Sequence, residues 1–294
     1  MPVFETPDLR VTTIAAGSLW LDGGAMFGVV PKPLWSRRTQ VDEANRIPLA
    51  MRCLLVETAD ARVLVDTGVG AKESDKFLDI YRVDNPGSPT RLEDSLRAAG
   101  VEAADVDVVL STHLHFDHAG GNTRRDAHGE VTAAFPNAEY VIGRREWEFA
   151  HFDNERVKAS YLPDNFDPLD REGRIRFVEP GETVVPGIVV RGTPGHTPGH
   201  HSVLIGEGDR KLFYLADLVP TKAHLPLPWI MGYDVEPLVT LESKRGELGR
   251  AVAEGWTLAF EHDPDVAWGR PVESTPGRVE LVEVEHDPIT GRQE

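Results

Sequence analysis

Hydrophobic residues in this chain gather in short runs separated by polar and glycine-rich stretches. Most of the runs are rich in Val, Ile and Leu, which is typical of β-strands. The pattern predicts strands at residues 11–21, 50–57, 62–66, 106–111, 139–142, 188–192, 202–205 and 211–216.

Three other segments carry helical signatures, at residues 88–99, 144–151 and 236–254. In the first, Leu92 and Leu96 recur on one helical face and Gly100 follows the last periodic residue. In the last, Pro237 suits a first helical turn and Gly255 suits the exit. Helices are therefore interspersed with the strands.

The predicted strands fall into two blocks, each accompanied by helices. This arrangement predicts an α+β fold with two mixed sheets packed face to face and helices outside. We see no repeat, low-complexity segment or linker, so we expect one domain over residues 1–294. Residues 23–45, 153–171 and 220–236 are irregular and too long for simple turns, which is typical of a substrate pocket or lid.

Composition narrows the range of partners. The 294 residues are 40% hydrophobic and carry a net charge of −17, which would repel nucleic acid and anionic lipid surfaces. The chain start lacks a secretory pattern, and no apolar run reaches the roughly 18 residues of a membrane span. We expect a cytoplasmic protein with a small-molecule substrate. The apolar residues 24–35 are expected to wall a pocket, to form a homodimer contact or to be a buried hairpin.

The only cysteine, Cys53, lies within a predicted strand, so we expect an inert core thiol. The densest candidate chemistry is the segment HLHFDH at residues 113–118, directly after an apolar run. Imidazole nitrogens and carboxylate oxygens are ligands that zinc prefers. His196 in the sequence GHTPGH, Asp217 and His262 each follow another apolar run. The chain reads as a metalloenzyme.

HLHFDH, GHTPGH, a strand-end aspartate and a late histidine, in this order, resemble the metallo-β-lactamase superfamily. The resemblance implies a four-layer αβ/βα sandwich with a dinuclear metal site at one edge of its sheets. Carried onto this chain, it assigns His113, His115 and His196 to the first metal, Asp117, His118 and His262 to the second, and Asp217 to a bridge between them.

Two divalent metal ions held in this way would make a bridging water available as hydroxide near neutral pH. We expect this hydroxide to attack a substrate carbonyl, with Asp117 or a bound water delivering the proton to the leaving group. Zinc is the default metal, although the same donors could hold manganese, iron, cobalt or nickel.

The resemblance also implies supporting residues. Asp66 matches an aspartate that holds a ligand histidine from behind, and His200 is expected to be structural instead of a ligand. Lactonases of this superfamily often use a tyrosine hydroxyl to polarise the substrate carbonyl. This chain lacks an unambiguous equivalent, and His224 or Tyr233 could supply that hydrogen bond.

The favoured function is hydrolysis of a small ester-like compound, with a lactone as the leading example. Alternatives on the same site are phosphotriester, thioester and β-lactam hydrolysis, since fold resemblance does not assign a substrate. Two other classes stay open: a nuclease of the ribonuclease Z type, which the acidic balance disfavours, and a non-catalytic metal-stabilised binding protein. Flavodiiron oxidoreductases carry a glutamate where His115 stands, together with a flavin domain that this length cannot hold.

Overall fold

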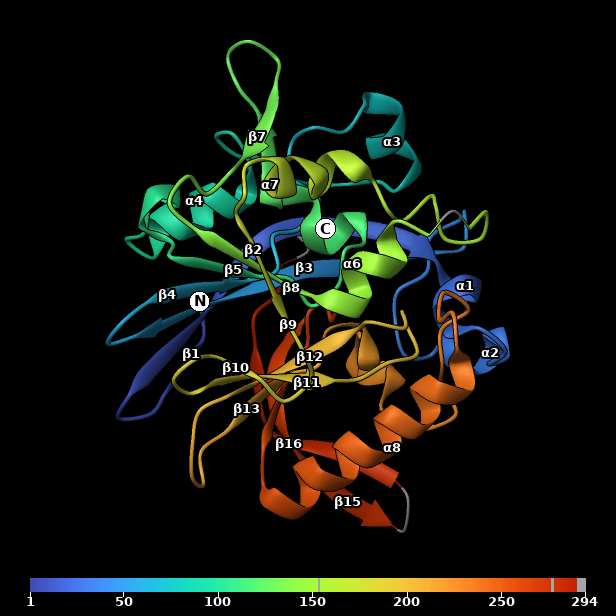
Figure 1. Cartoon of the computed structure of the whole chain (residues 1–294). Helices are drawn as coiled ribbons and strands as arrows, with labels where there is room; N and C mark the ends of the chain where they lie inside the picture. The colour runs from blue at the N-terminus through green and yellow to red at the C-terminus, as the bar shows by residue number, and fades with distance from the viewer. Residues whose placement is uncertain (153, 276–277, 290–294) are drawn as a thin grey trace.

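The computed structural model describes residues 1–152, 154–275 and 278–289. In this part of the chain, most strands belong to two seven-stranded sheets (Figure 1). The first sheet contains, in spatial order, β1 (Val3–Glu5), β2 (Leu9–Asp22), β3 (Arg46–Thr58), β4 (Arg62–Val65), β5 (Val108–Leu110), β8 (Glu139–Gly143) and β9 (Ile175–Val178). Strands β4, β5, β8 and β9 run parallel to one another, and the other pairs are antiparallel.

The second sheet is also mixed, because β13 and β14 are parallel within an otherwise antiparallel order. It contains β10 (Thr183–Val185), β11 (Ile188–Gly192), β12 (His201–Ile205), β13 (Leu212–Tyr214), β14 (Thr257–Ala259), β15 (Val266–Thr275) and β16 (Arg278–His286). A small hairpin is formed by β6 (Thr123–Arg125) and β7 (Val131–Ala133).

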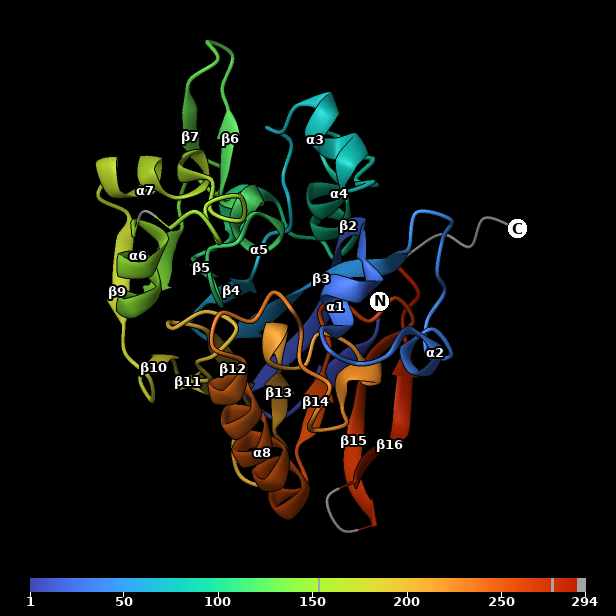
Figure 2. The same ribbon diagram turned by 90° about the vertical axis from the view of Figure 1, so that its right-hand side faces the viewer.

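The helices cover the outer faces of both sheets (Figure 2). They are α1 (Gly23–Phe27), α2 (Lys32–Trp35), α3 (Asp75–Ile80), α4 (Arg91–Ala98), α5 (Phe116–Ala119), α6 (Arg144–Ala150), α7 (Asp167–Arg171) and α8 (Pro237–Glu254). Short 3-10 helices lie at Ala103–Asp105, Gly120–Asn122, Pro163–Asn165, Ala216–Leu218 and Lys222–His224.

Alternation of side chains along β3 shows how the layers form. Leu54 and Val56 pack between the two sheets, whereas Cys53 and Leu55 face the helices outside the first sheet. All four side chains are buried, because β3 is covered on both faces. The predicted αβ/βα sandwich is confirmed.

The outer layers bury the helical faces that the sequence predicts. In α4, Leu92 and Leu96 join the core outside the first sheet. In α8, Leu248 and Ala251 pack on the second sheet, and Gly255 ends the helix in a left-handed conformation with φ of 69°. The predicted strands and these helices are confirmed, with shifts of a few residues at their ends.

The C-terminal pair β15 and β16 was not predicted from the sequence. Val279, Leu281 and Val284 are interspersed with glutamates along β16 and pack against the core outside the second sheet, so a strand-type pattern was present in the sequence and was missed. Backbone pairing with β15 completes the strand. The irregular segments 23–45, 153–171 and 220–236 also contain short helices that the sequence did not indicate.

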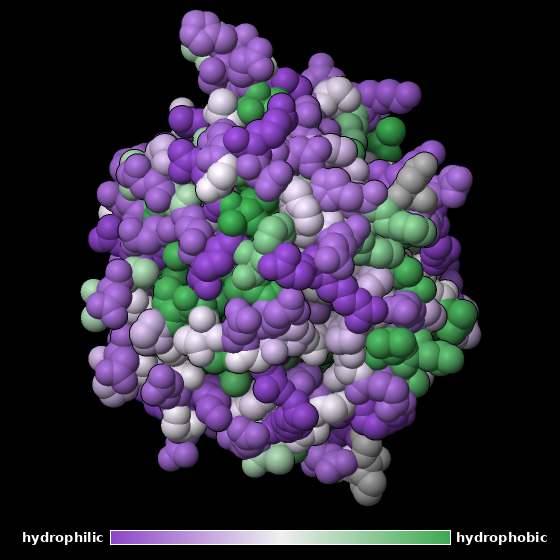
Figure 3. Space-filling model, in the orientation of Figure 1, coloured by the Kyte–Doolittle hydropathy of each residue, from purple (hydrophilic) through white to green (hydrophobic). Residues whose placement is uncertain are grey.

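The face shown in Figure 3 is largely hydrophilic, in keeping with the acidic composition, and its apolar patches are small. Within residues 1–152, 154–275 and 278–289, no helix is long and apolar enough to cross a membrane. Cys53 is buried, and burial holds the pKa of its thiol well above the usual value, as an inert core position requires.

Candidate metal centre

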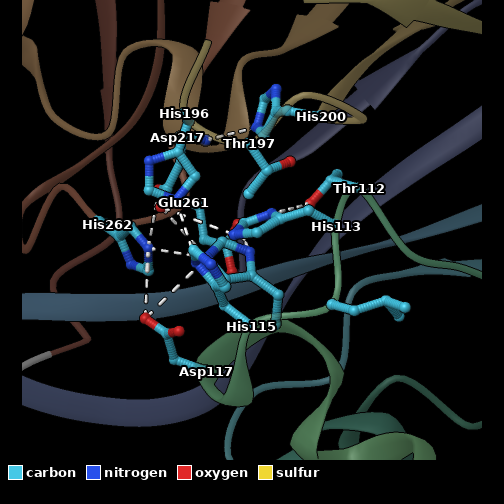
Figure 4. Close-up of polar contacts among 12 residues, drawn as sticks. Thr112, His113, His115, Asp117, His196, Thr197, His200, Asp217, Glu261 and His262 are labelled. Atoms are coloured by element: carbon cyan, nitrogen blue, oxygen red, sulfur yellow. Dashed lines mark hydrogen bonds and ion pairs between the residues drawn. The ribbon is translucent and has the colours of Figure 1, made fainter. Parts of the chain in front are cut away.

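The predicted ligands lie just beyond strand ends at one edge of the sandwich. Asp66 follows β4 and the segment 113–118 follows β5, which is parallel to β4. Asp217 follows β13 and His262 follows β14, a second parallel pair. Because the carboxyl ends of parallel strands meet at the same edge, side chains from both sheets converge there (Figure 4).

One group of ligand atoms comes from His113, His115, His196 and Asp217, and these atoms lie within 4.8 Å of one another. His196 Nε2 is 2.9 Å from Asp217 Oδ2 and 3.1 Å from His115 Nδ1. His113 Nε2 is 3.8 Å from the same Asp217 oxygen. The structure therefore brings together the residues predicted for the first metal.

A second group comes from Asp117, His118 and His262, again within 4.8 Å of one another. His262 Nε2 is 3.2 Å from His118 Nε2 and 3.1 Å from Asp217 Oδ1. Asp217 Oδ2 faces His196 in the first group, so this single carboxylate presents one oxygen to each group. That is the geometry expected of a bridging ligand.

The donor set fits divalent cations. The Nε2 atoms of His113 and His115 are buried without a hydrogen-bond partner among the residues that the structure describes. His262 donates from Nδ1 to the carbonyl of Ala50 at 2.7 Å, which leaves its Nε2 lone pair directed at His118 and Asp217. Buried imidazole nitrogens and carboxylate oxygens that face one another without hydrogen bonds are costly. A divalent cation bound between them removes this cost by accepting their lone pairs.

Electrostatics within the cluster point the same way. Burial acts to raise the pKa of Asp217, but His196, His262 and His118 outweigh it and hold that pKa well below its usual value. Burial acts to lower the pKa of His196, yet Asp217 and Asp234 raise it to about 10. For His262, Asp217 overcomes burial and raises the pKa to about 9. Protons and cations therefore compete for these nitrogens.

Hydrogen bonds from behind orient the ligand rings. Asp66 Oδ2 lies 3.2 Å from His118 Nδ1, in the place predicted for it. Asp66 also accepts from the backbone N–H of Thr112 at 2.8 Å and from its hydroxyl at 2.7 Å. The Thr112 oxygen lies 3.1 Å from His113 Nδ1, so the same aspartate supports a ligand of each group.

His200 lies beside the cluster in a supporting position. Its Nε2 accepts a hydrogen bond from the backbone N–H of Asp217 at 3.2 Å, and its Nδ1 lies 3.2 Å from the carbonyl of Thr193. With both nitrogens engaged, His200 holds the backbone of Asp217 and has no lone pair left for a cation.

Three buried carboxylates were missed by sequence reasoning. Asp234 accepts from His196 Nδ1 at 2.9 Å. Glu146 in α6 accepts from the backbone N–H of Leu114 at 3.0 Å and from the Thr197 hydroxyl, so it joins the two ligand loops. Glu261 lies beside His118. Glu261 directly precedes His262 in the sequence, but no local pattern pairs any of the three carboxylates with the distant residues that they contact.

A pocket of about 370 Å³ opens onto the cluster, in the size range of small-molecule sites. All three segments predicted to be irregular contribute to its walls, together with residues of β2, β3, α5 and the turn after α3. The apolar part of the lining includes Leu21, Met26, Leu49, Phe116, Val157 and Met231. Its polar part, apart from the cluster itself, includes Tyr81, Arg156, Ser160 and Tyr233.

The two candidate polarising residues differ in placement. Tyr233 lines the pocket, and burial raises its pKa to about 12, so its hydroxyl stays a donor at neutral pH. His224 instead stacks on Phe27 at 4.5 Å, donates from Nε2 to the carbonyl of Met26 at 2.9 Å and pairs through Nδ1 with the Thr221 hydroxyl at 2.8 Å. His224 has no free nitrogen and does not line the pocket, which leaves Tyr233 as the candidate to polarise the substrate.

The αβ/βα sandwich, the site at its edge and the order of the ligands along the chain are typical of metal-dependent hydrolases. The family model for the metallo-beta-lactamase superfamily matches residues 48–251, and the chain belongs to that superfamily. A probable metal-dependent hydrolase from Staphylococcus aureus is similar over 95% of this chain and 99% of its own, with 31% identity and a TM-score of 0.85.

Lactonases are among the other similar proteins. An N-acyl homoserine lactonase from a Bacillus species is 34% identical over 167 residues, which are 54% of this chain and 59% of that protein. The dizinc quorum-quenching lactonase AidC, solved with a product, N-hexnoyl-L-homoserine, has a TM-score of 0.77 over 96% of both chains. Its identity of 23% supports the fold alone. The chain thus matches little more than half the length of the Bacillus lactonase.

Proposed function

We propose that this chain is a metal-dependent hydrolase of small ester-like substrates, with a lactone as the favoured substrate. The observation that carries the proposal is Asp217, which offers one oxygen to each of two buried ligand groups at the floor of a largely apolar pocket. Lactonases among the relatives support the choice of substrate class.

Two divalent cations, with zinc as the first expectation, would supply a bridging hydroxide and polarise the substrate carbonyl when bound. His113, His115 and His196 would hold one cation and Asp117, His118 and His262 the other. The role of the surrounding residues is positioning, because Asp66, Asp234 and Ala50 fix the orientation of three of the ligand rings.

Substrate contacts fall to residues of the pocket. The Tyr233 hydroxyl has no hydrogen bond to another described residue, so it is free to donate to a carbonyl oxygen as negative charge develops there. Asp117 also lines the pocket and could return a proton to the leaving alkoxide. The apolar wall of the pocket would contact the apolar substituent of the lactone ring and keep water away from that substituent.

The decisive experiment pairs metal analysis with a substrate panel of lactones, aryl esters, thioesters, phosphotriesters, β-lactams and RNA. We expect about two divalent ions per chain and turnover that is best with a lactone. Better turnover of another member would replace the lactone, and a metal-loaded protein without any turnover would favour a non-catalytic binding protein. One domain over residues 1–294, a cytoplasmic location and a homodimer stay predictions.

Ligand substitutions test the site itself. Because Asp217 and His115 belong to the same buried donor group, Asp217→Ala or His115→Ala should abolish metal retention and hydrolysis together. Metal content by mass spectrometry and the initial rate of lactone opening measure both effects. Near-normal values in either variant would contradict the assignment.

A further inference from the structure

Glu261 is a buried carboxylate that the proposed reaction does not use. It follows β14 directly before His262, and its side chain has no exposed surface. Neither of its oxygens accepts a hydrogen bond from any residue in the described part of the chain. A buried carboxylate without hydrogen bonds is costly, so its presence calls for a compensating positive charge.

The nearest partner is the ring of His118, through which the charge of a cation bound at Nε2 could reach the carboxylate. Glu261 Oε2 lies 2.9 Å from His118 Nδ1, closer than Asp66 Oδ2 at 3.2 Å. Only the Asp66 contact has the geometry of a hydrogen bond, and Asp66 is further fixed by Thr112. The Nδ1 proton of His118 is therefore directed at Asp66. Glu261 accepts no hydrogen bond from it and contributes only its negative charge beside the ring.

The three residues form a compact cluster on the side of His118 away from Asp217. Ligand-type atoms of Asp66, His118 and Glu261 lie within 4.8 Å of one another, whereas His118 Nε2 faces Asp217 Oδ2 at 3.6 Å. Figure 4 shows Glu261 among the ligand side chains. Negative charge on the Nδ1 side strengthens electron donation from Nε2.

We infer that Glu261 is a positioning and charge-balancing residue for the second cation, acting through His118 of the Asp117, His118 and His262 group. The inference rests on the proposed metal site. Glu261 touches no substrate in this assignment, so its removal should change metal occupancy before it changes the chemistry of the loaded enzyme.

The test is a stepwise titration of metal-free protein. Zn²⁺ binding is measured by calorimetry, and Co²⁺ binding, in a separate titration, by the visible cobalt spectrum. Glu261→Gln keeps the shape and removes the charge, and Glu261→Met also removes the buried polar group. Both should weaken one of the two binding steps about 10- to 100-fold and leave the other unchanged. The control is Glu247→Gln, a buried glutamate of α8 that pairs with Arg191 and Arg250 away from the cluster.

The outcomes separate this inference from the proposed function. If the wild-type chain takes up no divalent ion, the proposed function fails. If the wild type binds two ions and both Glu261 variants bind them equally well, only the role of Glu261 is overturned. Two variants that fail to fold, judged by circular dichroism beside the control, would also overturn it, since Glu261 would then be a packing residue.

Discussion

Asp217 shows how a single residue can define a site at the residue scale. Its two oxygens lie 2.9 Å from His196 Nε2 and 3.1 Å from His262 Nε2, so it contacts both ligand groups. Its backbone N–H is held by His200, and Ala216 before it has a φ of 44°, a conformation that directs the chain sharply out of β13. Local strain at this turn is part of what places the carboxylate.

Tyr233 provides the residue-scale prediction. If its hydroxyl donates to the developing oxyanion, Tyr233→Phe should lower kcat for lactone opening by about 10²- to 10³-fold. Metal content should stay at the wild-type level, because Tyr233 is not part of either ligand group. Steady-state kinetics and metal analysis on the same preparation measure both. The companion variant Tyr81→Phe, also in the pocket lining, controls for loss of a hydroxyl as such; equal rates for wild type and Tyr233→Phe would remove the tyrosine from the mechanism.

At the scale of elements, two lysine side chains hold loops around the site and its pocket. Lys244 of α8 is fully buried and donates to the carbonyls of Pro226 and Trp229 at 2.8 and 3.0 Å. Lys72 donates to the carbonyls of Gly120 and Thr123 next to the motif 113–118. Without these lysines the loop carbonyls would be buried without hydrogen bonds. The hydrogen bonds therefore fix the loop backbones in position.

Burial of Lys244 predicts a pH effect on stability. Burial lowers the pKa of Lys244 from 10.5 to about 7, so between these values the unfolded chain binds more protons than the folded chain. The free energy of unfolding should therefore rise with pH across this window, by at most about 1.4 kcal/mol per pH unit from this group. Urea denaturation from pH 6 to 10 measures the slope.

In Lys244→Met this contribution to the slope should disappear, whereas Lys76→Met, at an exposed position of α3, should retain it. The difference between each variant and the wild type isolates the lysine from other titrating groups. A wild-type slope that survives in Lys244→Met would show that this lysine is charged throughout the window.

Arg156 connects two of the pocket segments. Its guanidinium donates to the carbonyl of Gly232 at 2.8 Å, directly before Tyr233, and the residue lines the pocket. Arg156→Met should let the two segments separate and raise KM for the lactone about 10-fold, the scale of one charge-assisted hydrogen bond. Lys158→Met, an exposed change outside the pocket lining, is the matched control. An unchanged KM in Arg156→Met would mean that this hydrogen bond does not shape the pocket.

On the scale of the whole molecule, the site joins the two sheets. Asp66 and the motif 113–118 belong to the first sheet, while Asp217 and His262 belong to the second. Arg52 of β3 adds to this connection, since its buried guanidinium donates to the carbonyls of Phe260, Asp263 and Val266 around His262. Cations bound between the sheets should therefore stabilise the entire sandwich.

Metal removal tests this coupling. An ion present at about 100 times its Kd adds about 2.7 kcal/mol to the free energy of unfolding. For a chain of this size, chelation should then lower Tm by roughly 4 °C for each ion removed. Differential scanning calorimetry with and without chelator measures the shift, and re-addition of Zn²⁺ should restore it. Asp217→Ala should show no such shift; a wild-type Tm insensitive to chelator would argue against cations between the sheets.

Sequence patterns determined much of this protein by themselves. Apolar runs predicted most strands of the first sheet and, in the second, β11, β12 and β13. Side-chain periodicity together with Pro237 and Gly255 predicted α4 and α8. The motif 113–118 with three later strand-end residues carried the family resemblance that implied two ligand groups, and the structure brings these residues together. The strand and helix signals are local, because periodicity is set by neighbouring residues, whereas the grouping of the ligands came from the resemblance.

Tertiary structure alone decided the rest. Glu146, Asp234 and Glu261 became part of the site only when loops far apart in the chain met at one edge. His224 and Tyr233 looked equivalent in sequence, yet packing against Phe27 engaged one while the pocket kept the other free. Burial and long-range pairing depend on the whole fold, which no local run of residues specifies.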